Sequence, residues 1–128
     1  MAKRRELGDL QLAIMRVLWE RGEATAADVH AALLEERRLA PTTISTMLRK
    51  METKGVVTHR VDGRQFVFRA TVAEDEVRRS MVGALVERVF EGDRAALVSH
   101  LLEESDVDAG EIARLRRLID EAERREGR

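Results

Sequence analysis

The chain contains no cysteine among its 128 residues. This absence excludes disulfide bonds, thiolate metal sites, iron–sulfur clusters and thiol catalysis. No apolar run approaches the roughly 20 residues that a membrane span needs. The basic N-terminus is not followed by an apolar stretch of the signal-peptide type. We therefore expect a cytoplasmic protein.

Aromatic residues are also scarce, at 3% of the chain, and proline occurs once. Few aromatics argue against the core of a sandwich or barrel. Abundant Leu, Ala, Glu and Arg favour helices. The chain is 44% hydrophobic and 37% charged, and its length suits one domain or two very small ones. These features predict a mainly α fold with a small β-hairpin.

The net charge of −1 conceals an asymmetry along the chain. Residues 1–70 hold 13 Lys and Arg against 9 Asp and Glu, a net charge of +4. Residues 71–128 hold 10 against 15, a net charge of −5. A basic first half suits a polyanionic partner, although short segments often differ by a few charges. Charge alone leaves nucleic acid and solvated surface as open alternatives.

Two helices are expected at the start. The first is capped by Asp9, runs to about residue 20 and ends at Gly22. Its apolar residues form two stripes, which predicts burial on two sides, with Trp19 in the core. The second opens with a Thr25–Asp28 capping pattern and ends near residues 37–38, before the break at 39–41. Its inward residues are expected to be Val29, Ala32 and Leu33.

A third helix is expected from residue 42 or 43 to Gly55. Its apolar stripe lies opposite a polar stripe that contains no acid, since Glu52 falls outside it. Short hydroxyls let a backbone come close to DNA, and cations reach phosphates or guanine edges. This face therefore predicts a helix that enters the major groove.

A basic hairpin is expected next, with strands at 56–61 and 65–69 around an Asp62-Gly63 turn. The hairpin contains the cations Arg60, Arg64 and Arg69. The order of three helices and a basic hairpin predicts an N-terminal winged helix-turn-helix.

Three further helices are expected: one from a Thr71–Glu74 capping box to about residue 91, one capped by Asp93, and one from Asp108 to about residue 125. So small a unit is marginal alone, and pairing two copies would bury its surplus apolar surface. We expect a DNA-binding domain over residues 1–71 and a three-helix dimerisation domain over 72–128; packing of this half onto the first remains the alternative. The residues expected at the dimer interface are Met81, Leu85, Val89, Leu97, Leu101, Ile112, Leu115 and Ile119.

At this point the chain resembles the penicillinase-repressor family, BlaI/MecI and the related CopY proteins, over nearly its full length. The resemblance rests on the order and spacing of several stretches: residues 7–10 with 15–19, 25–30, 39–51 with 54–55, 63–68 and 92–98. It implies a dimeric repressor that binds inverted-repeat operator DNA in front of its target genes, which include β-lactam-resistance genes in that family.

Family contacts from the third helix and the wing, carried over by position, imply DNA-binding residues at Thr42, Thr43, Ser45, Thr46, Arg49, Lys50, Arg60 and Arg64. Staphylococcal members carry arginine at the position of Ser45 and lysine at that of Thr42, so the base preference differs where these cations are missing. In β-lactam-responsive members a membrane sensor-protease system leads to cleavage of an Asn-Phe bond. The matching bond here is His100-Leu101. The copper-responsive branch uses Cys-x-Cys motifs, which this chain lacks.

Other functions are compatible with parts of the sequence. A winged helix that binds proteins, or a regulator that senses a small molecule without proteolysis, remains the alternative. The histidines His30, His59 and His100 fall in separate elements without a neighbouring catalytic or metal-binding set. No Gly-rich phosphate loop or nucleophile elbow is present. We therefore expect no enzyme activity, no metal and no cofactor.

Overall fold

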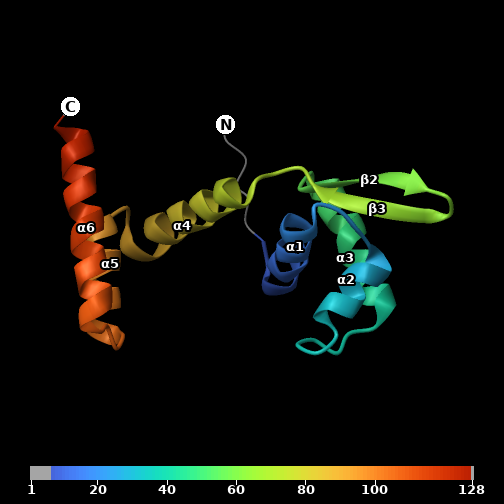
Figure 1. Cartoon of the computed structure of the whole chain (residues 1–128), viewed down its shortest axis with the longest axis horizontal. Helices are drawn as coiled ribbons and strands as arrows, with labels where there is room; N and C mark the ends of the chain where they lie inside the picture. Colours follow the sequence, from blue (N-terminus) through green and yellow to red (C-terminus); the bar gives the residue numbers. More distant parts are fainter. Residues whose placement is uncertain (1–6, 128) are drawn as a thin grey trace. The chain divides into compact units, whose positions relative to one another are not determined.

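The computed structural model describes residues 7–127. Figure 1 shows its elements, coloured along the chain. In chain order they are α1 (Asp9–Arg21), β1 (Ala24–Thr25), α2 (Ala26–Leu33), α3 (Pro41–Lys54), β2 (Val57–Asp62), β3 (Gln65–Ala70), α4 (Glu74–Phe90), α5 (Arg94–Glu104) and α6 (Ala109–Glu126). The predicted mainly α chain with a small antiparallel hairpin is confirmed.

The described chain divides into two compact units, of which the first ends at Leu85 and the second begins at Val86. This division falls inside α4. The prediction that residues 1–71 bind DNA and residues 72–128 form the dimer concerns binding partners. The division into compact units therefore does not test it.

The core of the first unit lies where α1, α2, α3 and the sheet meet. Ile14, Met15 and Leu18 of α1 are at most 1% exposed, as the two apolar stripes of this helix predict. Trp19 packs against the same core, and its indole Nε1 donates a 2.9 Å hydrogen bond to the Val72 carbonyl oxygen. Burial of this helix on two sides, with Trp19 in the packing, therefore agrees with the sequence pattern.

At the N-termini of the first two helices, one predicted cap is wrong and the other is right. Gly8, not Asp9, is the N-cap of α1, and Gly22 ends the helix with a φ of +86°. The capping box of α2 is confirmed: the amide of Asp28 donates to Thr25 Oγ1 at 3.1 Å, and the amide of Thr25 donates to Asp28 Oδ2 at 3.0 Å.

The second helix is shorter than expected. It ends at Leu33, before the predicted end near residues 37–38, and Ala32 is exposed although its spacing predicted an inward side chain. Val29 and Leu33 are buried as expected. Ala32 instead lines an open hollow next to Ala13 and Val17 of α1, so its side chain is not covered.

The sheet has three antiparallel strands in the order β1-β3-β2, one more than the sequence predicted. β1 is two residues long, and so short a strand leaves no periodic signal. Asp62 pairs with Gln65, so the turn consists of Gly63 and Arg64 rather than Asp62-Gly63. Gly63 has a φ of +65°, which a glycine at the first turn position adopts without strain.

Two helix starts also differ from the prediction. α3 begins at Pro41, which suits the first helical turn because that position has no hydrogen-bond partner for an N–H. The Thr71–Glu74 capping box is wrong: the Thr71 hydroxyl donates to the Gly55 carbonyl at 2.6 Å instead. α4 begins at Glu74, and the Ala73 carbonyl accepts from the Val77 amide at 3.2 Å.

The helices α5 and α6 begin as predicted. Asp93 accepts a hydrogen bond from the Ala96 amide at 3.0 Å, and Asp108 accepts one from the Glu111 amide at 2.8 Å. Neither helix contains a buried residue. Helices of this kind gain little from tertiary packing within one chain.

Candidate nucleic-acid interface

The outer face of α3 is the centre of the candidate interface. Ile44, Leu48 and Met51 on the inner face are at most 1% exposed, which fixes the rotation of the helix. The opposite face is exposed, with Ser45 half-buried, and consists of the predicted residues Thr42, Thr43, Ser45, Thr46, Arg49 and Lys50. The structure thus brings all six together on one surface.

The cations of this face have no acid partner in the part of the chain that the structure describes. Within residues 7–127, neither Arg49 nor Lys50 forms an ion pair. The one acid of α3, Glu52, turns to the side and binds His59. Two free cations beside several hydroxyls make a face that attracts phosphates and accepts close approach of a polyanion.

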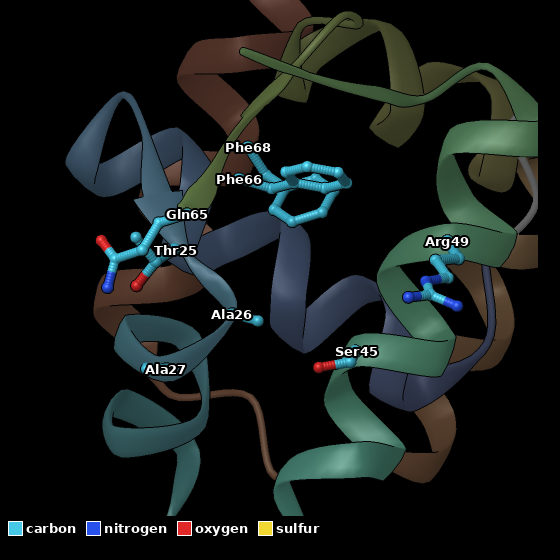
Figure 2. A pocket seen from close by; sticks show the side chains of 8 residues that line it. All are labelled: Thr25, Ala26, Ala27, Ser45, Arg49, Gln65, Phe66 and Phe68. Atoms are coloured by element: carbon cyan, nitrogen blue, oxygen red, sulfur yellow. The ribbon is translucent and has the colours of Figure 1, made fainter. Parts of the chain in front are cut away.

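A hollow of about 250 Å³ lies beside this face. It is lined by Thr25, Ala26, Ala27, Ser45, Arg49, Gln65, Phe66 and Phe68. Figure 2 shows Ser45 and Arg49 projecting from α3, with the two phenylalanine rings in the space between α3 and the start of α2. The surface next to α3 is therefore concave, with an apolar floor and a cationic rim.

A clamp between Glu52, His59 and Phe66 ties the hairpin to α3, and the sequence analysis missed it. The His59 Nδ1 atom lies 2.7 and 2.9 Å from the two carboxylate oxygens of Glu52. The imidazole stacks on the Phe66 ring with 4.0 Å between centroids. Because these contacts join β2, β3 and α3, they fix the hairpin relative to the helix.

The two predicted wing cations lie in different environments. Arg64 is exposed in the hairpin turn and forms no ion pair within the described residues. Arg60 instead donates to Glu23 through two hydrogen bonds, Nη2 to Oε1 at 2.7 Å and Nε to Oε2 at 3.1 Å. This hydrogen bonding lowers the pKa of Glu23 and raises that of Arg60. Arg60 is thus not the free cation that the sequence pattern suggested.

The remaining histidines belong to packing. His30 Nε2 lies 2.7 Å from the Leu39 carbonyl oxygen, and the His100 ring meets Phe90 edge-on with 5.9 Å between centroids. Among the described residues, no group of His, Asp and Glu side chains is arranged to hold a metal ion. In the same part of the chain, no helix has the length and apolar character needed to cross a membrane.

The residues expected at a dimer interface are incompletely covered in the single chain. Leu85, Val89, Leu101 and Ile119 are 43%, 62%, 50% and 56% exposed. Half-buried members of the same set are Met81, Leu97, Ile112 and Leu115. Each unit therefore presents large apolar side chains to solvent. The His100-Leu101 bond lies inside α5, with both residues exposed.

Comparison with known protein families gives one match over most of the chain. A family model described as penicillinase repressor matches residues 7–121. A transcriptional regulator BlaI of Mycobacterium tuberculosis is 39% identical over 125 residues, which cover 96% of this chain and 89% of that protein. The penicillinase repressor of Bacillus licheniformis is 26% identical over 125 residues and 98% of each chain.

Solved structures give the same likeness for the first unit. The solution structure of the DNA-binding domain of the repressor BlaI has 30% sequence identity and a TM-score of 0.52. It covers 59% of this chain and 93% of that domain. The monomeric form of Bacillus licheniformis BlaI, solved in complex with the blaP half-operator, also has 30% identity, with a TM-score of 0.51. The winged-helix fold that the element order predicted is thereby confirmed.

Proposed function

The chain belongs to the penicillinase repressor family, and on that premise we propose that it represses transcription by binding operator DNA as a homodimer. The observation that carries this proposal is the outer face of α3, where hydroxyls lie together with cations that form no ion pair among residues 7–127. The related BlaI monomer bound to a half-operator supports the same role for this winged helix.

The interface geometry suits a recognition helix in the major groove. Thr42, Thr43 and Thr46 are short enough to let the α3 backbone approach the base edges. Arg49 and Lys50, one or two turns later, reach phosphates or guanine acceptors. Arg64 in the hairpin turn contacts the phosphate backbone of the DNA beside the groove, as the wing of a winged helix does. In this proposal residues 1–71 read the DNA and residues 72–128 join two copies.

Dimerisation is supported by the uncovered apolar side chains of α4, α5 and α6. α5 and α6 have no buried residue in the single chain, although α6 has an apolar stripe at heptad-like spacing. Exposed apolar side chains in such number mark an interaction site. The partner we propose is a second copy, because a related monomer occupies half an operator and a twofold pair would occupy the whole.

The names of the relatives suggest what is regulated and how repression ends. They include the methicillin resistance regulatory protein MecI, so we propose resistance or other stress genes as targets. Proteolysis at His100-Leu101, downstream of a membrane sensor-protease system, is the release route that fits the family. The support for it is that α5 lacks buried residues, which makes local opening of this helix cheap.

Selection from a random duplex library tests the proposal. The full chain is expected to enrich sequences that contain an inverted repeat, with half-sites one helical turn or a multiple of it apart. Enrichment of an isolated half-site would contradict the dimer. Recovery of no sequence preference, with no retention of duplex at low salt, would contradict DNA binding itself.

A further inference from the structure

The ion pair between Glu23 and Arg60 lies outside the hydrophobic core of the first unit. Glu23 directly precedes β1, whereas Arg60 belongs to β2, with β3 between the two strands. Arg60 and Thr25 both oppose Val67 of β3, so Arg60 reaches across β3 to the residue before β1. The side chains remain 55% and 44% exposed, so this contact is a surface feature of the wing.

The pair occupies the hydrogen-bonding edge that Arg60 would offer to DNA. A guanidinium binds a carboxylate and a phosphate with the same two-pronged geometry. Through Nη2 and Nε, Arg60 already makes that contact with Glu23, at 2.7 and 3.1 Å. A DNA phosphate must therefore compete with Glu23 for the same donors.

The carboxylate of Glu23 interacts with more than one cation of the sheet. Its carboxylate also attracts Arg69, the next exposed cation of β3. The hydrogen bond with Arg60 holds the pKa of Glu23 below its usual range of about 4.5, so the carboxylate stays ionised as pH falls toward that value. Near neutral pH the competing charge is therefore always present. Arg49, Lys50 and Arg64 have no comparable acid partner within residues 7–127.

We propose that Glu23 is a positioning residue that keeps Arg60 from binding DNA phosphates and so lowers the affinity of the wing for DNA. The proposal rests on the DNA-binding function proposed above and adds a residue to it. It implies that the wild-type protein uses fewer phosphate contacts than its wing offers. The benefit is affinity low enough to discriminate among sequences, because phosphate contacts add binding without sequence preference.

The test measures DNA affinity of the full chain as a function of salt concentration, by fluorescence anisotropy with a labelled duplex. Glu23→Gln removes the competing charge, and Glu20→Gln is the matched control. Glu20 is also an exposed acid, in the last turn of α1, with no ion pair in the described chain. If each protomer gains one phosphate contact, the log–log slope steepens by about 0.9 per protomer in Glu23→Gln relative to Glu20→Gln. The ratio of the DNA affinity of Glu23→Gln to that of Glu20→Gln then falls roughly tenfold between about 50 and 200 mM salt, if the protein binds as a dimer.

A second substitution separates Arg60 from a general charge effect. Arg60→Gln is expected to change the slope little in the wild-type background and to abolish the gain in the Glu23→Gln background. Equal slopes for Glu23→Gln and Glu20→Gln, or weaker binding by Glu23→Gln, would overturn the proposal while leaving DNA binding intact. Absence of binding by every variant at low salt would overturn the proposed function as well.

Discussion

Replacing Ile119 by glutamate is expected to turn the proposed homodimer into a monomer. Ile119 lies on the apolar stripe of α6 and is 56% exposed in the single chain, so the fold of one chain does not depend on it. Burying an isoleucine contributes about 1.5–3 kcal/mol, and a twofold interface loses two of them and must also bury two charges. Because Ile119 is already partly covered in the single chain, about half of that burial is lost at each site, and with the two desolvated charges the total is on the order of 3 kcal/mol; sedimentation equilibrium should show a roughly hundredfold weaker dimer.

The same substitution is expected to weaken operator binding by about a hundredfold or more. Two linked half-site contacts gain from effective concentration, and a monomer loses this gain. Arg117→Glu is the control, because it adds negative charge to α6 at an exposed position off the apolar stripe. An Ile119→Glu protein that still sediments as a dimer would contradict the interface. A monomer with wild-type affinity for the full operator would contradict the mechanism.

Replacing Arg49 by alanine is expected to have the largest effect of any single change on the candidate interface. Arg49 is exposed on α3, beside Ser45 at the rim of the 250 Å³ hollow, and its guanidinium has no ion pair within residues 7–127. A contact with a base edge contributes about 1–3 kcal/mol of discrimination, so affinity for the selected operator should fall roughly 5- to 150-fold.

Two comparisons decide what Arg49 does. Loss of affinity for the operator that exceeds the loss for random duplex identifies a base contact, whereas equal losses identify a phosphate contact. Arg16→Ala, an exposed cation of α1 outside the candidate interface, controls for the change in net charge. Affinities of Arg49→Ala that match those of Arg16→Ala would remove Arg49 from the interface. Thermal unfolding should be nearly unchanged in both variants.

Much of the candidate interface could be predicted because its signal is local. An apolar stripe at helical spacing fixes which face of α3 is buried, and the hydroxyls and cations follow on the opposite face by geometry alone. The hairpin was equally readable, from a glycine between two alternating strands. Only the register of its turn was wrong, because Asp62 and Gly63 suit a turn as a pair while the structure places Gly63 and Arg64 there.

The parts that could not be predicted depend on contacts between distant residues. Glu23 and Arg60 are 37 residues apart, and they meet because β1 adds a third strand that has no periodic pattern of its own. Glu52 and His59 are seven residues apart, but the turn between α3 and β2 decides whether they face each other. Charge counting therefore indicated a basic first half of the chain, but it gave no sign that Arg60 is paired with Glu23.

The central claim is that duplex DNA binds to the outer face of α3 and to the hairpin turn. Titration of the ¹⁵N-labelled full chain with a selected operator duplex, followed by amide chemical shifts, tests it most directly. The account predicts the largest shifts at residues 42–50 of α3 and at Gly63 and Arg64, with smaller shifts along α1. Shifts confined to residues 86–127, or a spectrum unchanged by excess duplex at low salt, would contradict it.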